Sequence, residues 1–473
     1  MKQIIAWLLG PSLFLTTWLL GNMLGFEPGY VQVCAVALWM ISWWIGEAVP
    51  MAATALLPVV LFPFFGIATV EQVCANYANS TIFLFLGGFI IAMGLEKSGL
   101  HERIALLIIR NFGRSANGIL FGFLLATTLL SMWVSNTSTA LMMLPMARSI
   151  IKLLESKFSE AQRSSSFRNF SIALTLGIAY AANVGGIATL IGTPPNVVLK
   201  GQLEKLAGIQ IDFLAWMQIG IPISLLMLLI VYFSLNKLFF PNNLGKIEGG
   251  MELIQSKLME LGQLKKAEKY VLAIFCSTAF LWISGPWWND LIGKKLFNDT
   301  LVAILGGLAM FSIPTQKDFK GFVLEWEDTK SLPWNILLLF GGGLALAFGM
   351  KESGLMNVLG ESLTQLDLHP FVLLLVLTCI MLLLTEVMSN VALAIIFIPV
   401  VITLCDIKGL DTLTYTAAVA LASSFAFMLP ISTPPNAIVY GAGYIKIKDM
   451  IRVGFVLNLI SIALISAFLW IFR

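Results

Sequence analysis

The stretch that decides the fold is WVSNTSTALMMLP, residues 133–145, in which a polar triplet interrupts an apolar sequence. A related stretch, VMSNVALAIIFIP, occupies residues 387–399, so its triplet (389–391) lies 254 positions after the first (135–137). Small polar side chains inside an apolar, membrane-length stretch are costly unless they find partners. The repeated triplet therefore predicts a functional site that is built twice.

The composition around these stretches is that of an integral membrane protein. Hydrophobic residues make up 58% of the 473 residues and charged residues 12%, far from the values of a soluble domain. Many windows reach the roughly 20 apolar residues that cross a bilayer as a helix. We expect residues 4–24 to be a retained first span and not a cleaved signal peptide, because no small-residue cleavage site follows them. The expected surroundings are membrane lipid, and the net charge of +3 gives no reason to expect a nucleic-acid partner.

Cysteine and histidine patterns point away from enzymatic and metal chemistry. The five cysteines are scattered and are expected to be small buried hydrophobic residues. His101 and His369 have no metal-ligand spacing, so no metal other than sodium is expected. An intramembrane serine hydrolase would need a base beside one of the triplets, and neither histidine lies there. We therefore expect no catalytic residues. A channel is a further class. The two re-entrant hairpins predicted below open to opposite sides of the membrane, which favours a transporter whose site is exposed to one side at a time.

Two further motifs recur in the same order as the triplets. GLEKSGL at 94–100 resembles GMKESGL at 349–355, and GTPPN at 192–196 resembles STPPN at 432–436. Three ordered matches predict two related halves. Interrupted helices at matching positions of two halves are typical of secondary transporters with a site near the bilayer midplane.

The predicted fold is an all-α membrane protein with about 11 transmembrane helices and two re-entrant hairpins. The hairpins are expected at about 117–150 and 370–404, broken helices at about 170–206 and 412–443, and amphipathic segments at 97–113 and 351–365. The predicted units are N-terminal scaffold spans (1–81), a first repeat (82–240), a cytoplasmic linker (241–266), further scaffold spans (267–333) and a second repeat (334–473).

The distribution of lysine and arginine predicts the orientation. These residues gather around 103–114, 148–168, 237–269 and 446–452, which all fall on one side if the N-terminus is cytoplasmic. The first hairpin would then open to the cytoplasm and the second to the exterior. Two hairpins with opposite openings indicate an inverted repeat.

The Thr-Pro-Pro motifs predict where the broken helices restart. Proline lacks an N–H and disfavours a helical conformation in the residue before it. Thr193 and Thr433 suit the N-cap position, and Pro194 and Pro434 suit the first helical position. Together with the two triplets this predicts four helix N-termini near the same depth. Their free N–H groups and partial positive charge suit a carboxylate or another oxyanion.

The polar residues of the same segments suit a hard cation. No lysine or arginine occurs in 117–147, 171–199, 371–405 or 412–445, so a divalent anion would depend on co-bound cations for positive charge. Glu386 is the one acid in these stretches. It could tune a cation site, carry a proton, or partner a helix end or a hydroxyl. The candidate oxygen donors, which favour hard cations, are Ser131, Ser135, Asn136, Asn196, Thr385, Asn390, Ser432 and Asn436.

At these motifs the chain resembles the divalent anion/sodium symporter family, which includes bacterial dicarboxylate transporters. EAVP at 47–50, followed by Thr54 and Pro58, also resembles the family's early pattern. The resemblance implies a homodimer in a bacterial inner membrane, with scaffold and mobile transport domains and elevator-type alternating access. The implied substrate residues are Ser135, Asn136, Thr137, Ser389, Asn390, Val391, Thr193, Pro194, Thr433 and Pro434. The implied sodium residues are Ser131, Ser135, Asn136, Gly192, Asn196, Thr385, Met388, Asn390, Ser432 and Asn436.

One position departs from the family pattern. Val391 stands where many members have threonine, and a hydrogen bond to a charged group is worth about 1.5–3 kcal/mol. The hypothesis is sodium-coupled symport of a small divalent anion, a C4-dicarboxylate such as succinate, malate or fumarate, with sodium as the coupling ion and no organic cofactor. The alternatives are an anion exchanger without net sodium coupling and a sulfate or tricarboxylate carrier.

Overall fold

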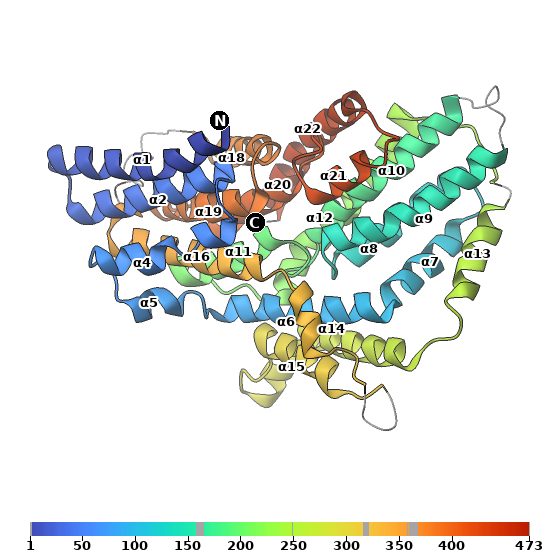
Figure 1. The fold of residues 1–473 in the computed structure, drawn as a ribbon, viewed down its shortest axis with the longest axis horizontal. Coiled ribbons are helices and arrows are strands. Elements are labelled where there is room, and N and C mark those ends of the chain that lie inside the picture. Colours follow the sequence, from blue (N-terminus) through green and yellow to red (C-terminus); the bar gives the residue numbers. More distant parts are fainter. Residues whose placement is uncertain are drawn as a thin grey trace.

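The chain forms an elongated bundle of helices (Figure 1). The structure, a computed structural model, describes residues 2–157, 165–247, 249–315, 321–356, 358 and 368–472. Among these residues the only β-type pairing is an isolated bridge between Pro314 and Phe322. The prediction of an all-α membrane protein is confirmed.

Eight helices within the described ranges are long and apolar enough to cross a membrane. The apolar stretch that follows α2 forms two short helices, α3 (Met51–Thr54) and α4 (Leu57–Phe64), and not one continuous span. Other shorter elements lie outside the eight long helices and the helices around the polar motifs. They include α5 (Val70–Ala75), α15 (Asp299–Ser312) and the 3₁₀ turn Trp326–Ser331. The eight are α1 (Lys2–Met23), α2 (Pro28–Gly46), α6 (Ser80–Ser98), α12 with its π-helical continuation (Phe213–Phe239), α14 (Lys266–Ile292), α16 (Trp334–Glu352), α19 (Asn390–Lys408) and α22 (Ile447–Ile471).

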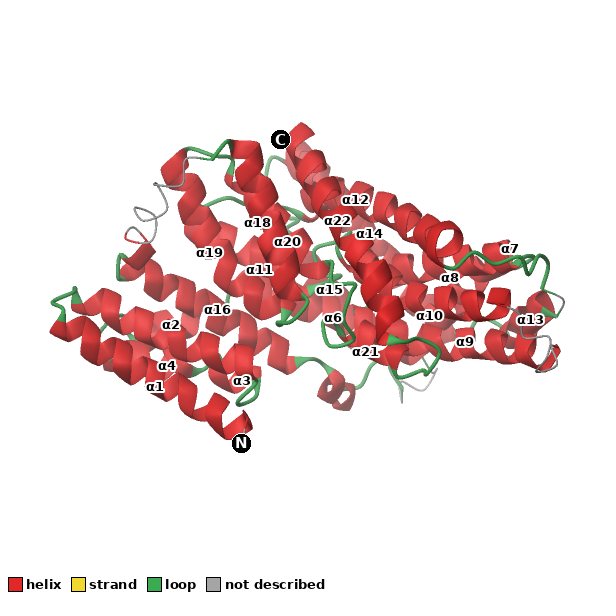
Figure 2. Cartoon of the chain, turned by 90° about the horizontal axis from the view of Figure 1, so that it is seen from above, coloured by secondary structure: helices red, strands yellow, loops and turns green. Residues whose placement is uncertain are grey.

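A helix–turn–helix unit surrounds each polar triplet. In the first half, α8 (Ala116–Ser131) turns into α9 (Asn136–Lys157), and in the second, α18 (Pro370–Thr385) turns into α19. The two views place the α8–α9 pair and the α18–α19 pair in different halves of the molecule (Figures 1 and 2). The two triplets are therefore carried into the centre from separate sides of the bundle.

Two helices are interrupted at the Thr-Pro-Pro motifs. The chain leaves α10 (Ser165–Gly186), restarts at α11 (Pro194–Gln202), leaves α20 (Thr412–Ser424) and restarts at α21 (Pro434–Tyr440). Both restarts have proline at the first helical position, where its missing N–H costs nothing. Every residue of α10 from Phe170 to Gly186 is buried, so the first break lies in the densest part of the core.

The Lys/Glu-Ser-Gly-Leu motifs form the same sharp turn in both halves. Gly99 and Gly354 both have φ of +77°, a left-handed conformation that glycine adopts without a steric penalty. The hydroxyls of Ser98 and Ser353 each accept a bond from the N–H two residues later. In the first half the turn leads into α7 (Leu100–Phe112), within the expected amphipathic segment. The second expected amphipathic segment, 351–365, lies for the most part outside the described residues.

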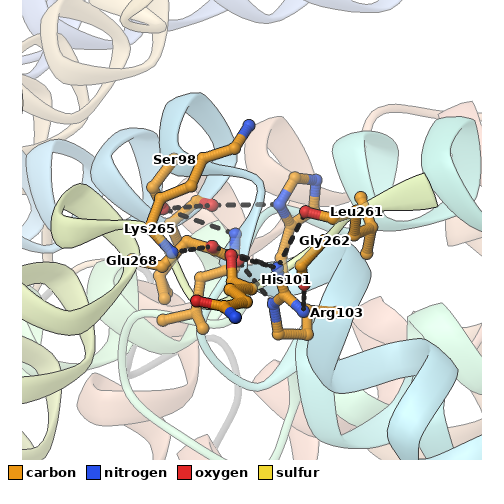
Figure 3. Close-up of polar contacts among 10 residues, drawn as sticks. Ser98, His101, Arg103, Leu261, Gly262, Lys265 and Glu268 are labelled. Carbon is orange, nitrogen blue, oxygen red and sulfur yellow. Dashed lines mark hydrogen bonds and ion pairs between the residues drawn. The ribbon is translucent and has the colours of Figure 1, made fainter. Parts of the chain in front are cut away.

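Arg103 ties α7 to the turn between α13 (Gly250–Glu260) and α14 (Figure 3). Its guanidinium binds the Glu268 carboxylate at 2.7 and 3.2 Å and donates to the carbonyl of Gly262 at 2.9 Å. Glu268 also accepts the N–H of Lys265, the N-cap residue of α14. Two residues before Arg103, His101 donates from Nδ1 to Leu95 O at 2.9 Å, and burial lowers the pKa of its imidazole. The contacts of Arg103 with Glu268 and Gly262, called the Arg103 clamp below, attach the predicted linker to the first repeat.

Replacing Arg103 with methionine is expected to destabilise the folded protein by about 3–5 kcal/mol, because the buried Glu268 carboxylate loses the guanidinium with which it is paired. The measurement is the thermal unfolding midpoint of the purified protein in detergent. Arg110→Met is the matched control, since Arg110 lies on the exposed face of the same helix. Equal midpoints for the two variants would show that the clamp carries no stability.

Candidate functional site

Both triplets and both Thr-Pro motifs line one cavity of about 690 Å³. The helix breaks bring residues from 135 to 437 to the same space, although each motif lies on a different element. The lining contains every residue that the sequence analysis assigned to substrate, namely Ser135, Asn136, Thr137, Thr193, Pro194, Ser389, Asn390, Val391, Thr433 and Pro434.

The two triplet turns have the same internal hydrogen bonds. Ser131 Oγ donates to Asn136 Oδ1 at 2.6 Å, and Thr385 Oγ1 donates to Asn390 Oδ1 at 2.7 Å. In each turn the serine of the triplet accepts the N–H three residues later, at 3.1 Å in the first and 3.5 Å in the second. The prediction that each triplet caps the helix that follows it is confirmed. The asparagines are thereby fixed at the first residues of α9 and α19.

The asparagines of the Thr-Pro-Pro-Asn motifs donate hydrogen bonds to backbone carbonyls of the two helix breaks. Asn196 Nδ2 donates to the carbonyls seven and ten residues earlier, at 2.8 and 3.3 Å. Asn436 Nδ2 makes the matching pair, both at 3.0 Å. The Oδ1 atoms of both side chains are buried and have no hydrogen-bond partner among the residues that the structure describes. Each break therefore presents an uncommitted amide oxygen in a setting where polar atoms are normally paired.

The two threonine caps differ. Thr433 accepts the N–H of Asn436 at 3.3 Å, whereas Thr193 stands at the N-cap position of α11 without a side-chain cap bond. Thr193 therefore occupies the expected N-cap position, but its hydroxyl makes no capping bond. The helix starts there all the same, because Pro194 sets the backbone.

The charge of the cavity is negative at its edge and neutral at the motifs. Among the described lining residues there is no lysine, arginine or histidine, while Glu47 and Glu96 are both present. Glu47 ends α2 in a left-handed conformation with φ of +46°. Positive potential near the motifs therefore comes from helix N-termini and from any cation bound beside them.

The residues assigned to sodium form an inner and an outer group. Ser135, Asn136, Gly192, Asn390 and Ser432 line the cavity. The others lie behind this lining and are connected to it through the turns: Ser131, Asn196, Thr385, Met388 and Asn436. All supply hydroxyl, amide or carbonyl oxygen, and the described residues contain no group of three His, Cys, Asp or Glu side chains that could hold another metal.

Asn183 and Gly186 of α10 belong to the site but were missed by the sequence analysis. Asn183 lines the cavity, is fully buried, and donates to Thr433 Oγ1 and to Ala426 O, both at 3.3 Å. Gly186 packs directly against the amide of Asn136, so that a Cβ would lie 2.6 Å from Oδ1. A polar residue inside an apolar helix was the available signal for Asn183. Nothing in the sequence distinguished Gly186 from other helical glycines.

The opposite wall of the cavity was also missed. It comes from the end of α2, the start of α3, one side of α6 and the turn that leads into α16. Of the repeated motifs it contains only Glu96 of GLEKSGL. Its residues are Glu47, Met51, Phe85, Phe89, Ala92, Met93, Glu96, Ser331, Leu332, Pro333 and Ile336.

Glu386 holds the break between α20 and α21. Its carboxylate is 5% exposed and accepts five hydrogen bonds, so it partners a helix break and a hydroxyl, as one of the three sequence interpretations stated. The donors are the N–H groups of Phe427 (2.9 Å), Met428 (3.0 Å) and Leu429 (3.2 Å), the Ser432 hydroxyl (2.6 Å) and the Asn458 amide (2.7 Å).

Apolar helices of membrane length, two helix–turn–helix units and two broken helices around one polar cavity define a membrane transport protein. Comparison with known sequences gives the particular family. The chain belongs to the family described as the sodium:sulfate symporter transmembrane region, which matches residues 2–472.

Relatives match over nearly the whole chain. It is 43% identical over 469 residues to a protein of Staphylococcus saprophyticus named sodium-dependent dicarboxylate transporter SdcS, covering 98% of this chain and 90% of that protein. It is 44% identical over 470 residues to the protein of the same name from Staphylococcus aureus strain USA300, with the same coverage.

Solved structures support the fold alone. The YdaH transporter of Alcanivorax borkumensis aligns with a TM-score of 0.61 at 16% identity, over 93% of this chain and 97% of that one. MtrF of Neisseria gonorrhoeae aligns with a TM-score of 0.55 at 12% identity, over 85% and 83% of the two chains.

Proposed function

We propose that the protein is a secondary active transporter that carries a C4-dicarboxylate such as succinate, malate or fumarate together with sodium ions. The observation that supports this most directly is the convergence of four helix starts on one cavity whose described lining has no cationic side chain. Such a site attracts an oxyanion through backbone N–H groups and needs bound cations to complete the charge balance. The names of the SdcS relatives agree with this assignment.

In this proposal the substrate lies between the two triplet turns. Ser135, Asn136 and Thr137 donate to one carboxylate, and Ser389 and Asn390 donate to the other. Thr193-Pro194 and Thr433-Pro434 close the floor of the site with the N-termini of α11 and α21. Val391 supplies an apolar contact in the first turn of α19.

Sodium ions are proposed to bind behind each turn. The first site uses oxygens from Ser131, Ser135, Asn136 and Gly192, with Asn196 behind it. The second uses Thr385, Met388, Asn390 and Ser432, with Asn436 behind it. The unpaired Oδ1 atoms of Asn196 and Asn436 support this placement, because a buried amide oxygen without a donor suits a cation.

The proposed transport cycle is an elevator movement in a homodimer. The hairpins and broken helices of the two repeats (α8–α11 and α18–α21) form the moving part, and the wall from α2, α6 and the turn before α16 belongs to a fixed scaffold. With the N-terminus in the cytoplasm of a bacterial cell, Glu47 and Glu96 lie at the cytoplasmic mouth of the cavity. Their negative charge favours cations over anions at that mouth of the cavity.

The direct test is uptake of radiolabelled succinate into proteoliposomes with and without an inward sodium gradient. Uptake that follows the sodium gradient supports symport. Uptake that requires internal dicarboxylate and ignores sodium would replace symport by exchange. Competition by unlabelled malate, fumarate, citrate and sulfate identifies the preferred anion.

Replacing Val391 with threonine is expected to change the order of competing anions. The added hydroxyl points from a cavity-lining position and can donate to an anionic oxygen, worth about 1.5–3 kcal/mol. Half-inhibitory concentrations should therefore shift by roughly tenfold or more for the anions that reach it. Val391→Ile is the control that adds volume without a hydroxyl. An unchanged competition order would remove residue 391 from contact with the substrate.

A further inference from the structure

The two halves differ at the residue that directly follows the first helix of each triplet unit. Met132 follows Ser131 at the end of α8, whereas Glu386 follows Thr385 at the end of α18. The two positions are 254 residues apart, like the triplets themselves (135 and 389). The two turns share the bond from the hydroxyl before this position to the triplet asparagine and the serine cap of the following helix. One turn therefore carries a buried negative charge that the other lacks.

A second difference accompanies the first. Ser432, whose hydroxyl donates to Glu386 at 2.6 Å, corresponds to Gly192 in the first half, 240 positions earlier. Gly192 has no side chain to connect a charge to the cavity. The second half therefore has both the Glu386 carboxylate and the Ser432 hydroxyl that connects it to the cavity. The first half has neither group.

No cationic side chain balances Glu386 within the part of the chain that the structure describes. The ion pairs found there join Lys97 to Asp328, Arg103 to Glu268 and Lys200 to Asp299. The groups facing Glu386 are neutral donors: three backbone N–H groups, one hydroxyl and the amide of Asn458 on α22.

The charge lies close to the second proposed sodium site. Thr385 is the neighbour of Glu386 in the chain, and Ser432 donates to its carboxylate. Both are among the oxygens proposed for that site. A cation bound there would be separated from the carboxylate by a single hydroxyl group, in a region where little solvent screens their attraction.

We propose that Glu386, acting through Ser432, makes the second sodium site the stronger of the two, so that it fills at a lower sodium concentration than the first. The inference rests on the proposed function, since it requires that sodium binds at both turns. At the separation of one hydroxyl group, an attraction of this kind is worth on the order of tenfold or more in affinity. Glu386 acts here as a positioning and charge-supplying residue without contact to the substrate.

The test compares variants that weaken one site each. Ser131→Ala and Thr385→Val remove the hydroxyl that bonds the triplet asparagine, and Thr385→Val also removes the bond from that hydroxyl to Ser423 O. The measurement is the thermal unfolding midpoint of the purified full-length protein against sodium chloride, with choline chloride holding the ionic strength constant. Ser131→Ala, which keeps the second site, should reach half of its stabilisation at roughly tenfold lower sodium than Thr385→Val. Adding Glu386→Gln to Ser131→Ala should remove this advantage, whereas Glu386→Asp should keep part of it.

Met132→Leu is the matched control at the corresponding position and should leave the sodium curve unchanged. Equal half-saturation of Ser131→Ala and Thr385→Val, or the reverse order, would overturn the inference without any use of a Glu386 variant. If Glu386→Gln does not fold, Ser432→Gly gives the second half the residue of the first, and its sodium curve should shift to higher concentration. A wild-type protein that sodium does not stabilise at all would instead contradict the proposed sodium coupling.

Discussion

Alanine at Asn136 or at Asn390 is expected to abolish sodium-driven succinate uptake, with a loss of at least about a hundredfold. Each amide joins a buried hydroxyl to the cavity, at 2.6 Å from Ser131 and 2.7 Å from Thr385. Truncation removes a donor to the anion, a candidate cation ligand and the partner of that hydroxyl. Hydrogen bonds to charged groups are worth about 1.5–3 kcal/mol each, and two of them account for this loss.

The measurement is initial uptake in proteoliposomes at equal protein density. Asn22→Ala is the matched control, since Asn22 lies exposed near the end of α1. Size-exclusion profiles should be the same for all three variants, which separates loss of the site from loss of the fold. Full uptake by either site variant would exclude that asparagine from the site.

The second large effect is expected for Gly186→Ala. The new Cβ would lie 2.6 Å from Oδ1 and 2.9 Å from Nδ2 of Asn136. Helix α10 is buried on all sides here and cannot move away, so the amide must shift. Overpacking of this kind costs about 1–3 kcal/mol, which corresponds to roughly a fivefold to hundredfold loss of sodium-dependent uptake. The protein itself should still fold, because the atoms that yield belong to a side-chain end.

Gly307→Ala is the control for a buried helical glycine. Its Cβ would meet Ile90 at 3.5 Å, an ordinary contact distance, and Gly307 lies outside the cavity lining. This variant should transport like the wild type. If Gly186→Ala also transports normally with an unchanged sodium requirement, the amide of Asn136 is not held as tightly as its contacts imply.

The sequence was most informative where structure is set locally. The helix restarts at Pro194 and Pro434 follow from the missing N–H of proline, and the turns at the two triplets follow from serine caps. These rules need only a few neighbouring residues. Because they appeared twice in the same order, they also predicted that two halves would meet at one site.

Parts of the site that depend on distant packing could not be read in this way. Asn183 acquires its role because α10 packs beside the second break, 243 residues further along the chain at Ala426. Glu386 was recognised as unusual, but its partners lie on α22 and in the second break, which the sequence does not pair with it. The wall from α2, α6 and the turn before α16 is mainly apolar, and its polar residues Glu47 and Glu96 gave no signal that these segments share a cavity with the two triplets.

The absence of a cationic side chain among the described lining residues has a consequence for how the specificity of such a protein can change. Helix ends and hydroxyls attract any compact oxyanion, whether its oxygens are planar as in a carboxylate or tetrahedral as in a sulfate. Discrimination between these shapes is then left to single small residues such as those at 137 and 391. A change of cargo during evolution would need only a side-chain exchange at such a position, with the charge balance of the pocket preserved.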